Sequence, residues 1–165
     1  EAKKLSSMYT LADILKANCG TLDIRGVAHK GFFASITDFP SYYDANMNLL
    51  DYKAAQELFH DNWPIYTRTN DSCPTQYFDT AEVKNSVISN GCQIEGTVEN
   101  SVIGRGCVIK KGAVVKNSVV LAEVTVGEGV HVENEVVDKW ARLVHEKEIV
   151  SPADQPGYIR RGDTL

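Results

Sequence analysis

The sequence lacks the features that place a protein in a membrane or on nucleic acid. No apolar run approaches the roughly 20 residues of a membrane-spanning helix, and no secretory signal peptide is visible. The 22 acidic residues outnumber the 17 basic ones, and a net charge of −5 gives no general attraction to nucleic acid or to an anionic membrane. We therefore expect a cytoplasmic protein that binds neither.

Cysteine is also scarce, and its spacing argues against a zinc site. The four cysteines contain no C-x-x-C pair. Cys92 and Cys107 each follow a glycine at matching positions of a repeat. The simplest interpretation is a pair of free thiols stacked in the core of a protein kept in a reducing compartment.

The most informative feature that is present is a repeat. A six-residue pattern, Val-(Lys/Glu)-Asn-(Ser/Glu)-Val-(Ile/Val), begins at Val83, Val98, Val115 and Val132, at intervals of 15, 17 and 17 residues. A shorter period of six runs inside it, through Ile103, Ile109, Val115 and Leu121. A period of six nested in a period of about 17 corresponds to three sides per turn, which predicts a parallel β-helix.

Simple packing rules support this prediction. β-Branched Val and Ile suit the inner face of a pleated wall, and small residues such as Cys107 and Ala113 fit where the interior is narrow. Asn tolerates left-handed backbone geometry, so Asn85, Asn100 and Asn117 are expected to stack at one corner. One coil cannot bury its own inner face, so several coils must stack. The hexapeptide pattern is typical of left-handed β-helices.

The first third of the chain shows helical signals instead. Apolar spacing predicts a short helix over 9–18 with Gly20 as its stop, and 22–36 reads as short extended pieces. Thr37 or Asp38 is expected to cap a second helix with Pro40 in its first turn. Its apolar face comprises Phe39, Tyr43, Met47 and Leu50. A further helical piece is predicted over 52–60.

These patterns divide the chain into three parts. Residues 1–60 form a short α/β segment, 61–80 read as a linker because of their Pro and Asn-Asp turn signals, and 81–165 form the β-helix domain. The repeat decays after Val137, so 139–148 are expected to cap the last coil and 151–165 to form a tail with one more strand.

A resemblance to a known family rests on particular residues. The segment Gly31-Phe-Phe-Ala-Ser-Ile-Thr-Asp-Phe-Pro-Ser-Tyr-Tyr-Asp-Ala-Asn-Met-Asn-Leu-Leu50 resembles the "GYWxDVGTxxSYxxANMDLL" segment of ADP-glucose pyrophosphorylases, also called glucose-1-phosphate adenylyltransferases. The segment Trp63-Pro-Ile-Tyr-Thr67 and the Asn-Ser-Val-Ile repeats then follow in that family's order. The resemblance covers residues 30–137 and implies the end of a nucleotidyltransferase domain joined to a left-handed β-helix domain.

One departure from the family pattern changes the expected role. The family carries an Asp that binds Mg²⁺, and this chain has Ser35 at that position. A neutral hydroxyl is a poor ligand for this hard cation. The family's glycine-rich phosphate loop lies upstream, so truncation would account for its absence, but truncation would not account for the missing Asp. The chain thus resembles the GlgD-type branch, which is a non-catalytic partner of GlgC-type catalytic subunits.

The resemblance sets what we expect of the chemistry. The parent reaction converts ATP and glucose 1-phosphate to ADP-glucose and pyrophosphate with Mg²⁺ in glycogen synthesis. We expect this chain to contain no catalytic residue and to hold no metal or cofactor. Its expected work is assembly, through a GlgC-type subunit or through self-association of the β-helix, and regulation of the catalytic partner.

Two groups of basic residues are candidates for binding a phosphorylated effector. Arg105, Lys110 and Lys111, with Lys116, lie at successive turns of the repeat, and Arg160-Arg161 lie in the tail. The alternative is that these are solvated corner residues. Adjacent arginines on a strand point to opposite faces, so at most one of the tail pair would contact a given anion.

His131 supports an alternative function. Hexapeptide acyltransferases use one His on a coil as the general base toward a sugar hydroxyl, with acetyl-CoA as donor. His131 is the only histidine in the repeats, so a sugar acyltransferase is the competing hypothesis, and a surface histidine is the simpler one. A three-histidine zinc site is excluded on the repeats. Phe32, Phe33, Tyr42, Tyr43 and Trp63 are expected to form an apolar seam between the first segment and the β-helix.

Overall fold

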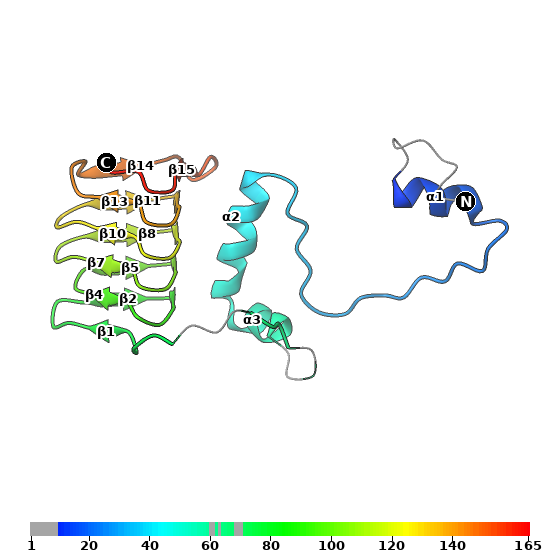
Figure 1. Ribbon diagram of the computed structural model, residues 1–165, viewed down its shortest axis with the longest axis horizontal. Helices are drawn as coiled ribbons and strands as arrows, with labels where there is room; N and C mark the ends of the chain where they lie inside the picture. The colour runs from blue at the N-terminus through cyan, green and yellow to red at the C-terminus, as the bar shows by residue number, and fades with distance from the viewer. Residues whose placement is uncertain (1–9, 60–61, 63, 68–70) are drawn as a thin grey trace. The chain divides into compact units, whose positions relative to one another are not determined.

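The computed structural model describes residues 10–59, 62, 64–67 and 71–165. Two compact units are distinguished, Glu1–Lys30 and Gly31–Leu165. None of the helices among these described residues is long and apolar enough to cross a membrane. In Figure 1 the second unit carries helices α2 and α3 and all of the labelled strands.

The first unit contains one short helix. Helix α1 (Leu11–Asn18) begins at Thr10, whose side chain accepts the backbone N–H of Asp13 while the Asp13 carboxylate accepts the N–H of Thr10. This reciprocal cap satisfies N–H groups that have no partner within the helix. The helix predicted over 9–18 is confirmed for its described residues. Residues 22–36, predicted as short extended pieces, form no β-strand in the described part of the chain.

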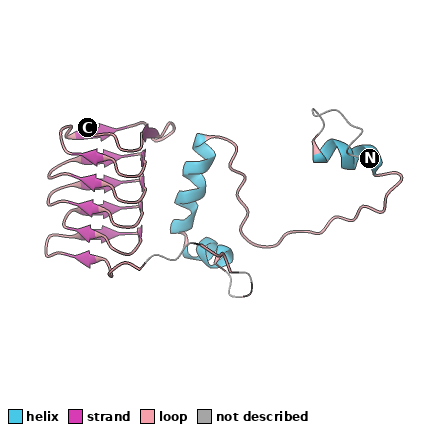
Figure 2. Cartoon of the chain, viewed as in Figure 1, coloured by secondary structure: helices cyan, strands magenta, loops and turns pink. Residues whose placement is uncertain are grey.

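The second unit opens with a helical segment. Helix α2 (Phe39–Met47) is followed by the 3₁₀ helix η2 (Asn48–Leu50) and by α3 (Tyr52–Leu58). Asp38 caps α2 by accepting the backbone N–H of Ser41, and Pro40 lies in the first turn, as predicted. The predicted end of α3 at residue 60 lies outside the described residues. These helices precede the strands along the chain (Figure 2).

Residues from Gln76 onward form a parallel β-helix of three five-stranded sheets. The chain visits the sheets in rotation, so each set of three successive strands makes one coil. Sheet A consists of β1 (Gln76–Tyr77), β4 (Gln93–Ile94), β7 (Val108–Ile109), β10 (Thr125–Val126) and β13 (Arg142–Leu143). Sheet B consists of β2 (Glu82–Lys84), β5 (Thr97–Glu99), β8 (Val114–Lys116), β11 (His131–Glu133) and β14 (Glu148–Val150). Sheet C consists of β3 (Val87–Ile88), β6 (Val102–Ile103), β9 (Val119–Val120), β12 (Glu135–Val137) and β15 (Gly157–Ile159).

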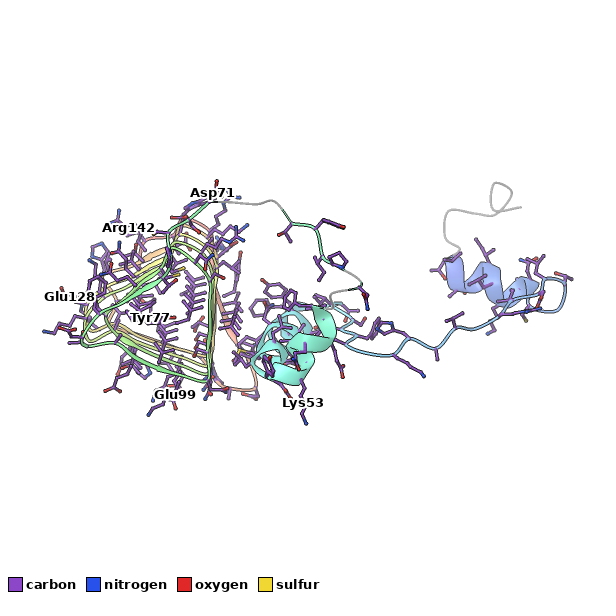
Figure 3. The ribbon with its side chains drawn as sticks, turned by 90° about the horizontal axis from the view of Figure 1, so that it is seen from below. Lys53, Asp71, Tyr77, Glu99, Glu128 and Arg142 are labelled. Carbon is purple, nitrogen blue, oxygen red and sulfur yellow. The ribbon has the colours of Figure 1, made fainter. Side chains whose placement is uncertain are left out.

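The register of these strands confirms the repeat. Each pair of neighbouring strands is parallel, and the equivalent letters of successive repeats lie opposite one another, for example Val98 opposite Val115. Figure 3 shows the triangular outline of the coils, with Tyr77 pointing inward and Glu99 and Arg142 pointing outward. The core is the column of inward residues, among them Ile94, Val98, Ile103, Ile109, Val115, Val132 and Leu143.

The β-helix is longer than the sequence indicated at both ends. Strand β1 lies within 61–80, the range expected to be a linker, so the first coil begins by Gln76. The range 139–148, expected to cap the last coil, instead supplies β13 and the start of β14. The strand predicted in the tail is β15, and an isolated bridge then places Thr164 beside Arg142.

The interior and corner predictions are confirmed residue by residue. Cys92 and Cys107 are free and buried. Their Sγ atoms donate to the carbonyl oxygens of Gly104 at 3.1 Å and Leu121 at 3.0 Å. The interaction with the Cys92 thiol, and then burial, raise the pKa of the Cys107 thiol. The three predicted corner asparagines, and Asn134 above them, all have positive φ values.

Helix α2 packs on the outer face of sheet C. The Tyr43 hydroxyl donates to the carbonyl oxygen of Asn117 at 2.5 Å, and the ring of Phe39 meets the ring of Tyr158 edge-on at 5.8 Å. Tyr43 therefore lies in the predicted apolar seam, whereas Phe33 is 78% exposed and Trp63 lies outside the described residues.

Candidate functional site

A second corner of the β-helix, like the asparagine corner, has a residue with positive φ in each coil. It lies between each strand of sheet C and the next strand of sheet A. The residues with positive φ are Gly91, Gly106, Glu123, Trp140 and Gly162. Backbone N–H groups link the layers, since Trp140 donates to Ala122 and Gly162 donates to Lys139. This pairing sets Arg161 directly above Lys139 and Gly162 above Trp140.

Positive charge gathers at the C-terminal end of this corner. We call Lys139, Trp140, Arg160 and Arg161 the basic corner. The Arg161 guanidinium lies over the Trp140 ring, 4.0 Å from its centre, in a cation–π contact. Lys139 and Arg160 belong to the two turns that meet here, and both residues are exposed.

A carboxylate borders the basic corner and orients its polar groups. Asp138 Oδ1 accepts the backbone N–H of Lys139 at 2.6 Å, and its Oδ2 accepts the hydroxyl of Tyr158 at 2.8 Å. The bond from Lys139, the hydroxyl of Tyr158 and the charge of Arg161 lower the pKa of Asp138. The hydrogen bond from the Tyr158 hydroxyl to Asp138 raises the pKa of Tyr158. Asp138 is therefore an ionised acceptor at neutral pH.

The basic residues predicted from the repeat to form one site do not lie together in the structure. Arg105 lies on the same corner as Lys139, two coils lower, and the neighbouring layer there carries Glu123. Lys110 and Lys111 lie at a different corner, between sheets A and B. Lys116 lies on the outer face of sheet B, with its Nζ 3.8 Å from Glu99 Oε2.

The tail arginines do lie at the basic corner, though not on a strand. Strand β15 ends at Ile159, so Arg160 and Arg161 belong to the turn that follows it. The argument from strand alternation was therefore wrong in its premise. The two side chains nevertheless differ in environment: Arg161 lies over Trp140, whereas the charge of Arg160 acts on Tyr158.

The catalytic positions considered from the sequence lie elsewhere. Ser35 is exposed in an irregular segment before α2. A neutral exposed hydroxyl does not fit Mg²⁺, and the described residues contain no group of three His, Cys, Asp or Glu side chains that could hold a metal ion. His131 lies on β11 with its Nε2 buried and 3.2 Å from Glu133 Oε2, so this nitrogen faces a carboxylate of its own strand.

Sequence reasoning missed Lys139, Trp140, Asp138 and Tyr158. A signal for two of them was available, because Trp140 and Lys139 occupy the repeat positions that Gly106 and Arg105 hold two coils earlier. An aromatic residue at a position filled elsewhere by glycine was the feature to notice. The sequence did not indicate that Arg161 lies over Trp140, because the insertion at 152–156 changes the spacing between the last two layers.

Comparisons with known proteins agree with the fold. Residues 74–155 match the family described as GlmU-like, C-terminal hexapeptide. The chain is 31% identical to the glycogen biosynthesis protein GlgD of Bacillus subtilis (strain 168), over 93% of this chain and 45% of that protein. It is 36% identical to the glycogen biosynthesis protein GlgD of Geobacillus stearothermophilus, over 65% of this chain and 31% of that protein.

Catalytic-type names occur among the similar proteins as well. The chain is 38% identical to the glucose-1-phosphate adenylyltransferase of Fervidobacterium nodosum, over 66% of this chain and 26% of that protein. The chain thus spans less than half the length of each of these relatives. Its repeats, its β-helix and these similarities together show that the chain belongs to the GlgD and glucose-1-phosphate adenylyltransferase family of glycogen biosynthesis.

Proposed function

We propose that this protein is a non-catalytic, regulatory and assembly portion of a glucose-1-phosphate adenylyltransferase. The reaction of the whole assembly would form ADP-glucose and pyrophosphate from ATP and glucose 1-phosphate. The chain would bind a GlgC-type catalytic subunit, or a second copy of itself, through the β-helix. It would modulate the catalytic partner without contributing to bond formation.

The observation that carries this proposal is Ser35. The resemblance places a Mg²⁺-binding Asp at this position, and a carboxylate is what the cation requires there. Ser35 is neutral and exposed. An in-line displacement at a phosphate depends on a metal to neutralise developing charge, so loss of this ligand alone would lower the rate severely.

The basic corner supports the regulatory part of the proposal. Lys139, Arg160 and Arg161 present positive charge in a chain whose net charge is −5. A phosphorylated small molecule is the ligand that such a cluster recognises best, because charge-assisted hydrogen bonds to phosphate are among the strongest available. We therefore place the effector site here, and not at Lys110 and Lys111.

Co-expression with a GlgC-type catalytic subunit tests the proposal. We expect a mixed oligomer by size-exclusion chromatography, and a change in the rate of ADP-glucose formation or in its response to sugar phosphates. The chain alone should give no ADP-glucose. Turnover by the chain alone, or failure to associate with or affect the catalytic subunit, would contradict the proposal.

The competing acyltransferase function has a separate test. Acetyl-CoA is added to the chain in a thermal melt, with the His131→Ala variant as the control. A ligand-dependent rise in the melting temperature that the variant abolishes would support acyl transfer. We expect no such rise, because the Nε2 atom of His131 faces Glu133.

A further inference from the structure

The outer face of sheet B is turned toward solvent. Helix α2 packs on sheet C, and in Figure 3 both helices of the second unit lie beside one side of the triangle. Each strand of sheet B turns its first and third residues outward, and these residues are exposed or half-buried. The face is therefore open to a partner along several layers.

The outward residues of sheet B form two columns. We call the first column the charged stripe, because its positive and negative side chains alternate from layer to layer: Lys84, Glu99, Lys116 and Glu133. The second column consists of Glu82, Thr97, Val114, His131 and Glu148. Lys116 Nζ lies 3.8 Å from Glu99 Oε2, yet the two side chains remain 40% and 36% exposed. Both can therefore still contact charges on another molecule.

The charged stripe is complementary to itself under one two-fold rotation. An axis that lies in the plane of contact, parallel to the strands and between β5 and β8, reverses the order of the layers and keeps each column opposite itself. Lys84 of one copy then faces Glu133 of the other, and Glu99 faces Lys116, with each pair occurring twice. In the second column the acid of β2 faces the histidine of β11, and the threonine of β5 faces the valine of β8. No like charges meet in either column.

Other two-fold arrangements match the charges less well. An axis across β8 would place Lys116 opposite itself and Glu99 opposite Glu133. An axis parallel to the length of the β-helix, between the columns, would place Glu99 opposite Thr97 and Lys116 opposite Val114, so neither charge would be paired. The pattern therefore selects one orientation and one register, which is what complementary charges supply at an interface.

We propose that the outer face of sheet B is a homodimer interface, on which a second copy of this chain docks with Glu99 facing Lys116 in both directions. This inference rests on the proposed assembly function and adds the surface that performs it. The layers are about 4.8 Å apart, so the matched patch is only about 20 Å tall. Such a patch is small for a permanent interface, so the dimer is reversible and its charges determine orientation more than strength.

Charge reversal at the centre of the patch tests this surface. Lys116→Glu sets acidic residues against each other across the interface, and Glu99→Lys sets basic residues against each other. Each variant alone should dimerise at least about tenfold more weakly than the unaltered chain. An equimolar mixture of the two variants should recover the dimer, because each acidic residue of one then faces a basic residue of the other. Sedimentation velocity of the 165-residue chain at rising concentration measures each equilibrium.

Two controls accompany these variants. Arg142→Glu makes the same change of charge as Lys116→Glu, but at an exposed position on sheet A, and it should leave dimerisation unchanged. Added salt should weaken the dimer of the unaltered chain, since charges on the surface are screened. Recovery in the mixture also shows that both variants are folded, because two misfolded chains would not restore a specific dimer.

The outcomes separate this inference from the proposed function. The inference is wrong if the unaltered chain stays monomeric at about 1 mM, if both variants dimerise as strongly as it does, or if the mixture recovers no dimer. In each of these cases the proposed function stands if the chain still forms a mixed oligomer with a GlgC-type subunit. If that association fails as well, both proposals fail.

Discussion

A ladder of serines runs up one edge of sheet C, and a glutamate takes the place of serine in its fourth layer. The hydroxyls of Ser101 and Ser118 each donate to the carbonyl oxygen two residues earlier, and each accepts the backbone N–H of the next layer. The next residue in this column is Glu135, which is 4% exposed. Its Oε1 accepts the Ser151 hydroxyl at 2.5 Å.

Burial raises the pKa of Glu135, and this has a consequence for stability. A raised pKa means that the native state binds the proton more tightly than the unfolded state does. Glu135 therefore favours the native state below about pH 4, where glutamate is neutral in the unfolded chain, and this contribution is lost as the pH rises through the native-state pKa. Glu135→Gln, which is neutral at every pH, should remove this dependence.

We expect the Glu135→Gln variant to melt about 2 °C higher than the unaltered chain at pH 7 and at the same temperature near pH 4. Thermal melts followed by circular dichroism across this range would measure the difference. Glu148→Gln, which removes an exposed glutamate of β14, is the matched control. Equal behaviour of the two variants would show that net charge, and not burial, is responsible.

Gly157 faces the same carboxylate. A Cβ atom on residue 157 would collide with both Glu135 oxygens and with the Ser151 hydroxyl, although the φ of Gly157 is not positive. Gly157→Ala should therefore destabilise the chain by about 2 kcal/mol through overpacking. In a Glu135→Ser background, which restores the ladder residue, most of this loss should disappear. Urea unfolding of the four proteins gives the coupling energy, and additive effects would contradict the explanation.

At the scale of elements, the outer face of sheet B carries a stripe of alternating charge. Lys84, Glu99, Lys116 and Glu133 lie opposite one another on successive strands. Neighbouring strands of a sheet are about 4.8 Å apart, close enough for opposite charges to attract and like charges to repel. This alternation favours the observed order of the strands, because displacing one strand by a full layer would place two like charges side by side.

The Lys116→Glu variant tests the stripe. It sets three acidic residues in a row, and we expect it to lower the free energy of unfolding by about 1 kcal/mol. High salt should recover most of this loss, since charges on the surface are screened. Arg142→Glu is the matched control, because its strand neighbours on sheet A, Thr125 and Thr164, are uncharged. A loss in Lys116→Glu that does not respond to salt would exclude the electrostatic explanation.

The coils show what a repeat can and cannot predict. The repeated residues of the central coils predicted which side chains point inward, because each coil stacks on the next in register. The last coil was missed because Arg142-Leu143 and Glu148-Ile149-Val150 retain only the alternation and have lost the shared letters. The candidate site had the same limitation, since the contact between Trp140 and Arg161 joins layers separated by an insertion.

At the scale of the second unit, the interior of the β-helix and its contact with α2 use different apolar side chains. The interior cluster includes Val120 and Val137 but not their neighbours Val119 and Val136, which are each 1% exposed. Alternation along β9 and β12 points those neighbours outward, toward the face of sheet C where α2 packs (Figure 3). Helix α2 is therefore attached to a β-helix whose own core does not depend on it.

This separation predicts that α2 can be released without unfolding the β-helix. Val136→Lys places a charge under the helix, so we expect the α2 amides to exchange hydrogen about a hundredfold faster. Exchange in the inner strands should change little, because their interior side chains are untouched. Hydrogen exchange with mass spectrometry resolves the two regions. Val102→Lys, in the same outward column but partly exposed, is the matched control and should leave α2 protected. Uniformly faster exchange throughout the second unit in Val136→Lys would instead mean that helix and β-helix unfold as one.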